Sequence, residues 1–244
     1  MKKAIILSAG QGKRLLPLTA DQPKCLIRLG KRTLLGWQVE SLVMAGIREI
    51  VVVIGFEAAK VEAELMRLAR PGLILRAVYN PFYSVADNLG SVFLARPEMT
   101  EDFMILNGDT VFEPALLEKV IQKARGPITV TVDRKATYDD DDMKVQLDGE
   151  QLLDIGKKLP ASIVNGEAIG LHCFVGMGPA LFASAVEQAM RAPEGLKSWY
   201  LSVVSRLAKT GAVNSTLIEG LRWGEVDYLP DVDRAVKLAE SWNH

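Results

Sequence analysis

The sequence predicts an α/β fold in which a mixed, mostly parallel sheet is covered by helices on both faces, and three observations favour it. First, apolar runs such as AIILS (4–8) and IVVVI (50–54) have the length and composition of strands buried on both sides. Second, segments with helical spacing of apolar residues separate such runs as far as residue 132, and strands joined through helices lie parallel in one sheet. Third, Asp148-Gly149 separates two further short runs and favours a hairpin.

The individual elements follow from these patterns in chain order. Gly46 suits the end of the first helix, because glycine readily adopts the left-handed conformation that closes a helix. The expected strands cover residues 4–8, 50–54, 73–79, 103–106, 128–132, 143–147, 151–155 and 170–176. The expected helices cover residues 34–45, 57–69, 87–95, 114–124, 179–191, 199–209 and 230–242. We interpret the hairpin as an insertion on the same sheet, so residues 1–244 are expected to form one domain.

Composition and charge argue against several classes of function. The chain has 29 Lys and Arg against 30 Asp and Glu, so it has no general basic surface for nucleic acid. Its two cysteines, Cys25 and Cys173, lack the spacing of a metal site and are typical of buried thiols in a reducing compartment. The apolar run after Lys2 and Lys3 is too short for a signal segment or a membrane span. We therefore expect a cytoplasmic protein that neither binds nucleic acid nor inserts into membranes.

The loop SAGQGKRLLPLT (8–19) follows the first expected strand. Ligands bind beyond the carboxyl ends of parallel strands, which makes this loop a candidate site. Gly10 and Gly12 allow backbone N–H groups to approach a phosphate closely, and Arg14 adds a positive charge. The loop is neither a dinucleotide motif, because Leu15 replaces its third glycine, nor a P-loop. It predicts a phosphate site of another kind.

Three motifs together resemble the nucleotidyltransferase superfamily (NDP-sugar pyrophosphorylase-like). Its members make NDP-sugars or CDP-alcohols. The motifs are LSAGQGKRLLPLT…QPK (7–24), NGD (107–109) at the end of a later strand, and WGEVD (223–227) near the C-terminus. The resemblance spans most of the chain. It implies a Rossmann-like, three-layer α/β/α nucleotide-diphospho-sugar transferase fold with a mixed, mostly parallel sheet and a β-hairpin insertion.

The resemblance also implies a set of site residues. Lys24 would lie beside the reacting α-phosphate and act in catalysis with Arg14 and Asp109. Mg²⁺ would be held by Asp109 and by Glu225 or Asp227, which point to the same face if they lie on a strand; which of the two dominates stays open. The nucleotide-binding residues implied by the resemblance are Ser8, Ala9, Gly10, Gln11, Gly12, Lys13, Arg14, Lys24, Asn88 and Ser91.

The chemistry implied by the resemblance suits these residue types. A phosphate oxygen of the acceptor attacks the α-phosphorus of the nucleotide, and pyrophosphate leaves. Because the nucleophile is already an anion, no side-chain base is needed, and catalysis depends on aligning two anions and screening their charge. Mg²⁺ commonly binds through one or two carboxylates together with phosphates and waters, which agrees with so small a set of acids.

The segment YNPFYSVADNLGSVFLA (79–95) bears on the substrate. It lacks the glycine-rich turn that reads the base in sugar-1-phosphate uridylyl- and thymidylyltransferases. Its Asp-Asn pair followed by Ser91 resembles the CTP:phosphocholine and inositol-phosphate cytidylyltransferase branch. There Lys144 or Lys157 would hold the phosphate of the acceptor, and Glu167 would contact the acceptor. The expected partners are thus CTP, or another NTP, and a small phosphorylated alcohol or sugar, and the resemblance also allows a homodimer.

Two further segments have alternative interpretations. The acidic run 139–142 is either a solvated loop or, with Tyr138, Trp199 and Tyr200, a box for a cationic head group. His172 lies within an apolar strand pattern and is expected in the core.

Other functions also stay open at this point. They are a sugar-1-phosphate nucleotidyltransferase that uses another NTP, a glycosyltransferase, and a non-catalytic nucleotide sensor. A glycosyltransferase would typically carry Asp-x-Asp where this chain has Asn107-Gly108-Asp109. A sensor would have no need to keep Lys24, Asp109 and Asp227 together.

Overall fold

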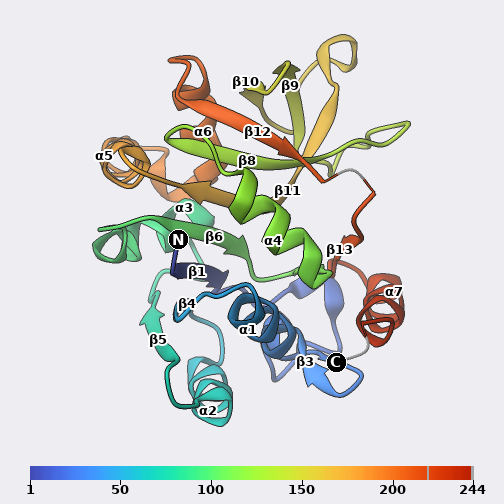
Figure 1. Cartoon of the computed structure of the whole chain (residues 1–244). Helices are drawn as coiled ribbons and strands as arrows, with labels where there is room; N and C mark the ends of the chain where they lie inside the picture. The colour runs from blue at the N-terminus through green and yellow to red at the C-terminus, as the bar shows by residue number, and fades with distance from the viewer. Residues whose placement is uncertain (219, 243–244) are drawn as a thin grey trace.

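A nine-stranded sheet forms the centre of the computed structural model, which describes residues 1–218 and 220–242 (Figure 1). The strand order is β5-β4-β1-β6-β11-β8-β12-β10-β9. These strands are β1 Lys3–Ser8, β4 Glu49–Ile54, β5 Ile74–Tyr79, β6 Phe103–Asn107, β8 Ile128–Asp133, β9 Lys144–Asp148, β10 Gln151–Ile155, β11 Gly166–Phe174 and β12 Val213–Leu217. Two short antiparallel pairs join β2 Arg28–Leu29 to β3 Arg32–Thr33 and β7 Thr110–Phe112 to β13 Trp223–Glu225.

The strand directions agree with the predicted mixed, mostly parallel sheet. β1 runs parallel to both β4 and β6, β4 runs parallel to β5, and β12 runs parallel to β8. β11 lies between β6 and β8 and is antiparallel to both. The hairpin of β9 and β10 continues the same sheet, because β10 pairs with β12 and β9 pairs with β11.

Helices cover both faces of the sheet, which completes the predicted three layers (Figure 1). They are α1 Leu34–Met44, α2 Ala58–Leu68, α3 Asn88–Leu94, α4 Pro114–Lys123, α5 Gly178–Met190, α6 Tyr200–Ala208 and α7 Leu229–Glu240. Apolar side chains of α1, α2 and α4 share one core with Ile6 of β1, while those of α3, α5 and α6 share another with Ile5. Successive residues of a strand face opposite sides, so one strand serves both cores. His172 lies fully buried in β11, as expected.

A third core brings the C-terminal helix to the beginning of the chain. Trp242, which follows α7, packs edge-to-face on Trp37 of α1 with ring centroids 5.7 Å apart. Val226, which lies within the C-terminal motif, and Leu15 of the glycine loop are buried in the same cluster. This packing brings the first and last sequence motifs together.

The sequence did not predict every strand. β12 has the sequence VNSTL, in which polar side chains interrupt the apolar pattern, and β7 and β13 are only three residues long. β11 begins at Gly166, four residues before the expected position. Among the described residues, no helix has the length and apolar character needed to cross a membrane.

Candidate active site

The turn after β6 carries Asp109 and lies tightly against the end of β1. A Cβ atom on Gly108 would come within 2.3 Å of Ser8 Oγ and 2.4 Å of the Leu7 carbonyl oxygen, so the turn needs glycine there. The buried Gln38 side chain donates from Nε2 to the carbonyl oxygens of Asn107 and Thr110, both at 2.8 Å. Backbone packing from one side and an amide from the other therefore fix the position of Asp109.

The glycine loop is shaped around the side chain of Lys24. Gly12 has φ 79°, and a Cβ atom there would come within 2.9 Å of Lys24 Cβ. Thr19 Oγ1 donates to the Gly12 carbonyl oxygen at 2.9 Å, and Gln11 Nε2 donates to the Thr19 carbonyl oxygen at 2.9 Å. These contacts order the loop at the carboxyl end of β1 and direct Lys24 along it.

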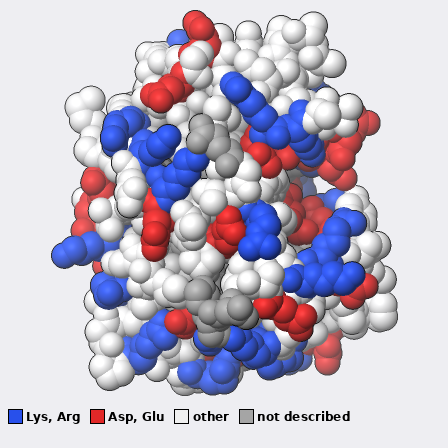
Figure 2. Space-filling view, turned by 45° about the vertical axis from the view of Figure 1, so that its right-hand side comes forward, with Lys and Arg blue, Asp and Glu red and all other residues white. Residues whose placement is uncertain are grey.

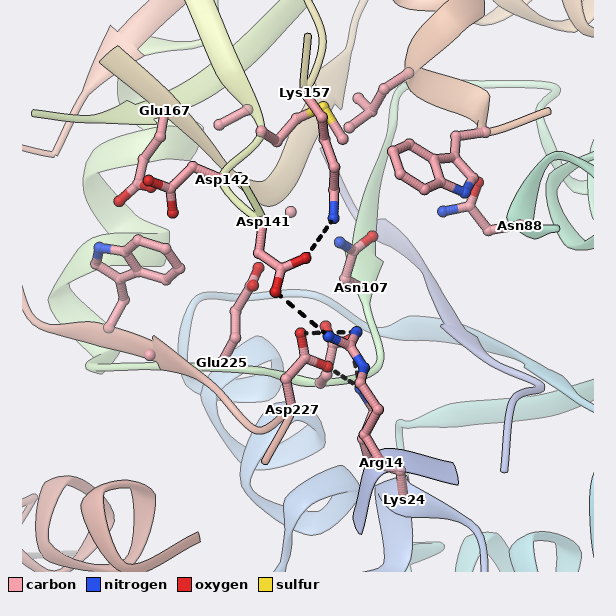
Figure 3. A pocket seen from close by; sticks show the side chains of 18 of the residues that line it. Arg14, Lys24, Asn88, Asn107, Asp141, Asp142, Lys157, Glu167, Glu225 and Asp227 are labelled. Carbon is pink, nitrogen blue, oxygen red and sulfur yellow. Dashed lines mark hydrogen bonds and ion pairs between the residues drawn. The ribbon is translucent and has the colours of Figure 1, made fainter. Parts of the chain in front are cut away.

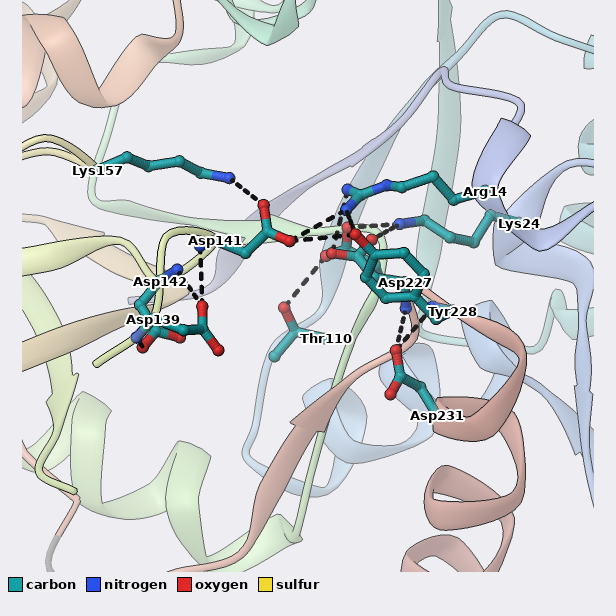
Figure 4. Close-up of polar contacts among 11 residues, drawn as sticks. Arg14, Lys24, Thr110, Asp139, Asp141, Asp142, Lys157, Asp227, Tyr228 and Asp231 are labelled. Atoms are coloured by element: carbon teal, nitrogen blue, oxygen red, sulfur yellow. Dashed lines mark hydrogen bonds and ion pairs between the residues drawn. The ribbon is translucent and has the colours of Figure 1, made fainter. Parts of the chain in front are cut away.

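Lys24 joins two of the predicted acidic residues. Its ammonium nitrogen lies 2.7 Å from Asp109 Oδ2 and 2.9 Å from Asp227 Oδ1, although these residues are 85 and 203 positions away in the chain. Figure 4 shows Lys24 beside Asp227. Burial alone would lower the pKa of Lys24, but the two carboxylates raise it above its ordinary value. Burial acts against the ionised form of Asp109, yet Lys24 keeps the Asp109 pKa below its ordinary value. Lys24 and Asp109 are therefore charged together at neutral pH.

Asp227 is positioned by the chain on both sides. Val226 N donates to the Asp109 carbonyl oxygen at 3.1 Å, which extends the β7–β13 pairing by one contact. The buried carboxylate of Asp231 accepts from the backbone N–H groups of Asp227 at 3.0 Å and Tyr228 at 2.7 Å. Asp231 lies in the first turn of α7, where an acidic side chain is favoured at a helix N-terminus.

Arg14 and Lys157 meet at the rim of the site through Asp141 (Figure 4). Arg14 lies 3.7 Å from Asp141 Oδ2 and 3.3 Å from Asp227 Oδ2, and Lys157 lies 3.3 Å from Asp141 Oδ1. The Tyr228 hydroxyl accepts from Arg14 at 2.9 Å and donates to Asp141 at 3.1 Å. The hydrogen bond from Lys157, followed by that from Tyr228, holds the pKa of Asp141 below its ordinary value.

A second acidic pair shares one lysine farther along the site. Lys135 Nζ lies 2.8 Å from Glu167 Oε2 and 2.7 Å from Asp142 Oδ1, and Figure 3 shows the two carboxylates side by side. Burial, together with the nearby Asp142, raises the pKa of Glu167 to about 7 although Lys135 opposes this shift. One ammonium thus serves two closely placed carboxyl groups.

These groups line a cavity of about 540 Å³ between the end of the parallel strands and the hairpin (Figure 3). Eight residues expected in the site lie in its wall. They are Arg14, Lys24, Asn88, Asp109, Lys157, Glu167, Glu225 and Asp227. Basic and acidic side chains are interspersed over the face in Figure 2, without a large area of either sign.

Other expected residues lie outside the cavity wall. The Lys144 ammonium is buried behind it and donates to the backbone oxygens of Asp139 and of Lys157, the latter at 3.1 Å. The Ser91 hydroxyl is also buried and accepts from Asn80 Nδ2 at 3.0 Å. The structure thus places Lys144 and Ser91 where they support neighbouring segments. In the glycine loop, Ser8 and Ala9 are buried, whereas the 10–13 segment is more open to solvent.

The aromatic box suggested for a cationic head group does not form. Tyr200 is fully buried in the core, and its hydroxyl lies 3.4 Å from Asn107 Oδ1. Trp199 already has the Lys157 ammonium 4.9 Å from its ring centroid, and Tyr138 has Lys135 at 6.0 Å. The hypothesis was wrong about Tyr200 because α6 begins at this residue and turns its ring into the sheet.

Sequence reasoning missed several residues that shape the site, namely Gln38, Asn107, Tyr228 and Asp231. Gln38 lies on α1, so only the fold shows that it contacts the turn of Asp109, whereas Asn107 was noted as part of the NGD motif but was given no role of its own. Asp231 had a usable signal, because an acidic residue three positions after a helix start is typical of a capping box. Tyr228 gave no comparable signal.

The acidic residues can supply oxygen ligands to a hard divalent cation. Burial, followed by the charges of Asp109 and Asp227, raises the pKa of Glu225 to about 8, and a cation bound nearby would favour its ionised form. Within residues 1–218 and 220–242, no three His, Cys, Asp or Glu side chains are grouped closely enough to hold a metal unaided. An ion such as Mg²⁺ needs only one or two carboxylates when phosphate oxygens complete its shell, so this donor set fits it.

Comparison with known proteins identifies the family. Residues 4–206 match the model of the MobA-like NTP transferase domain. The chain belongs to this family. Its nucleotide-transferase fold agrees with that of the inositol-1-phosphate CTP transferase from T. maritima, with a TM-score of 0.84, 22% identity and coverage of 100% of this chain and 97% of the other.

Two relatives align with nearly all of this NTP transferase domain chain. The bifunctional IPC transferase and DIPP synthase of Aquifex aeolicus is 27% identical over 239 residues, which are 97% of this chain and 51% of the relative. The CTP:phosphoglutamine cytidylyltransferase of Campylobacter jejuni is 25% identical over 252 residues, which cover 94% of this chain and 97% of the relative. The chain therefore spans about half the length of the first relative and nearly all of the second.

Proposed function

We propose that this protein is a Mg²⁺-dependent cytidylyltransferase that transfers CMP from CTP to a small phosphorylated alcohol or a similar phosphorylated molecule and releases pyrophosphate. The observation that carries the proposal is the meeting of Lys24 with Asp109 and Asp227 at 2.7 and 2.9 Å in the wall of a cavity. Family membership supports nucleotide chemistry. Two of the proteins named above, the CTP:phosphoglutamine cytidylyltransferase and the inositol-1-phosphate CTP transferase, have CTP in their names, which supports the choice of CTP.

The chain's own residues account for the reaction as follows. The glycine loop binds the triphosphate through its backbone N–H groups, and Arg14 and Lys24 contribute positive charge. A phosphate oxygen of the acceptor attacks the α-phosphorus, the bond to the bridging oxygen breaks, and pyrophosphate leaves with the electron pair. Lys24 stabilises the charge that develops on the α-phosphate oxygens, because a fixed cation in a partly water-excluded cavity acts strongly on such charge.

The acidic residues have two roles in this proposal. Asp109 and Asp227 keep the Lys24 ammonium in the cavity, and they are the residues that would hold Mg²⁺ together with Glu225. Bound Mg²⁺ supplies charge neutralisation between the triphosphate and the acceptor phosphate. Glu167 and Lys157 lie in the same wall and are the residues proposed to contact the acceptor.

A substrate panel tests this function. The purified protein is incubated with each of CTP, UTP, GTP and ATP against phosphocholine, phosphoethanolamine, inositol 1-phosphate, glycerol phosphate, phosphoglutamine and hexose 1-phosphates, and pyrophosphate release is measured. We expect release with CTP and one phosphorylated acceptor, and its loss in excess chelator. Turnover only with a hexose 1-phosphate and another NTP would replace the proposal by the sugar-nucleotide alternative. No release in any combination, from protein that binds CTP, would support a sensor.

A further inference from the structure

The rim of the cavity holds a carboxylate in the position that a bound anion would take. The Asp141 side chain lies between Arg14, Lys157 and the Tyr228 hydroxyl, at 3.7, 3.3 and 3.1 Å (Figure 4). These three groups come from the glycine loop, from the segment after β10 and from the residue before α7. They are thus brought together by the tertiary fold, and together they provide two cations and one hydroxyl donor.

The remaining basic residues of the cavity are held more firmly. Lys24 is fixed by two carboxylates at 2.7 and 2.9 Å, and Lys135 is fixed by Asp142 and Glu167 at 2.7 and 2.8 Å. Arg14 has a second contact at 3.3 Å with Asp227, whereas Asp141 is the carboxylate that contacts Lys157. A phosphorylated ligand that approaches Arg14 and Lys157 meets Asp141 at the same donors.

Asp141 is well placed to leave these donors. Its side chain is 59% exposed, and exposed ion pairs contribute little free energy because water solvates both partners. The base of its turn stays in place, because the Asp142 carboxylate accepts from Asp139 N at 2.7 Å and contacts Lys135 at 2.7 Å. A phosphate group carries more charge than a carboxylate and has more acceptor oxygens, so it competes well for the same donors.

We propose that Arg14, Lys157 and Tyr228 form a phosphate subsite whose occupant in the free protein is the carboxylate of Asp141, and that a phosphate group of a ligand displaces this carboxylate on binding. The inference rests on the proposed function in one respect, namely that the ligands entering the cavity are phosphorylated. The same donor chemistry suits the triphosphate end of a nucleotide and the phosphate of an acceptor. Asp141 thereby weakens phosphate binding while it balances the positive charges of Arg14 and Lys157.

The neighbouring Asp140 offers a matched control. It lies in the same turn and is exposed, and no hydrogen bond or ion pair of its side chain occurs within the described part of the chain. Asp140→Asn and Asp141→Asn remove the same charge from the same turn, so a difference between them reports the contact made by Asp141.

The test is calorimetric titration, without turnover, of CTP, inorganic pyrophosphate and phosphocholine into wild type and the two variants at low ionic strength. We expect Asp141→Asn to lower the Kd about three- to tenfold for the ligands whose phosphate enters the subsite. The change is of this size because the phosphate no longer has to displace a carboxylate held by a few weak, exposed contacts. Asp140→Asn is expected to stay within about twofold of wild type. Tightening for CTP and pyrophosphate alone assigns the subsite to the triphosphate, and tightening for phosphocholine alone assigns it to the acceptor.

Several results would overturn the inference. They are equal affinities for the two variants, weaker binding by Asp141→Asn than by wild type, or no binding of any of the three ligands by wild type and Asp141→Asn. The double variant Asp141→Asn/Lys157→Met sharpens the test, because the gain should largely disappear when Lys157 is already neutral. A gain that persists in full would also overturn it. Tightening in a protein that transfers CMP to no acceptor would keep the subsite and refute the proposed function.

Discussion

The centre and the rim of the cavity use the same kinds of charge in different surroundings. At the centre, the Lys24 side chain is 17% exposed and lies 2.7 and 2.9 Å from two carboxylates whose backbones are themselves held. At the rim, the Asp141 side chain is 59% exposed and its contacts with Arg14 and Lys157 are 3.7 and 3.3 Å long.

This difference separates two tasks that one site must perform. Gln38 and Asp231 fix the backbones of the centre, so its charges stay in place while reactants come and go. Fixed charges act on a developing transition state without the cost of reorientation. The rim is solvated and its ion pairs are weak, so its carboxylate can be exchanged for a phosphate. Substitutions in the two regions should therefore have different kinetic effects.

The largest effect is expected from Lys24 and Asp109. Lys24→Met keeps the length of the side chain and removes the ammonium, and we expect turnover to fall about 10²- to 10³-fold, as for the loss of one stabilising donor elsewhere. Asp109→Asn should cost at least as much. Turnover is measured by pyrophosphate release under saturating substrates. Lys123→Met, on an exposed lysine at the end of α4, is the control, and equal turnover of Lys24→Met and this control would remove Lys24 from the mechanism.

The residues that meet at the centre of the cavity could largely be predicted from the sequence. Parallel strands end at one edge of a sheet, so the loops after β1 and β6 had to meet there, and motif resemblance added Asp227. The rim could not be predicted, because the contacts of Asp141 depend on how a loop of polar residues folds against distant elements. Lys144 shows the same limit, since a lysine in an acidic segment turned inward to backbone oxygens. β12 was missed because its Ser215 and Thr216 are polar yet buried.

A smaller effect, on stability, is expected from the core next to the site, where His172 lies on β11. His172 is fully buried beside the Tyr200 ring, whose hydroxyl reaches Asn107, and burial lowers the pKa of His172 to about 3. The unfolded chain binds a proton at His172 below about pH 6.5, whereas the folded protein does so only near pH 3. The contribution of His172 to the free energy of unfolding is therefore fully present above pH 6.5 and is lost as the pH falls toward 3. At pH 5 the loss is about 2 kcal/mol relative to neutral pH.

His172→Leu isolates this contribution. The free energy of unfolding is measured with urea at pH 7 and at pH 5. Its decrease between the two pH values should be smaller for the variant than for wild type, by about 2 kcal/mol. The comparison uses the change between the two pH values, so a packing effect common to both cancels. If the free energy of unfolding falls by the same amount between pH 7 and pH 5 in wild type and variant, His172 is not held neutral by the core.

The smallest effect is expected from Asp231, which connects the two regions because its carboxylate accepts from the backbones of Asp227 and Tyr228. Asp231→Asn keeps the shape but removes the charge at the start of α7, and loss of such a cap costs about 1 kcal/mol of stability. Because Asp227 serves the centre and Tyr228 serves the rim, turnover should fall and KM should rise, each by less than about tenfold. Asp233→Asn, on an exposed acid of the same helix, is the matched control. A change in stability with unaltered kinetics would make Asp231 a cap for the helix alone, and the fixed centre would then owe its order to Gln38 and Lys24.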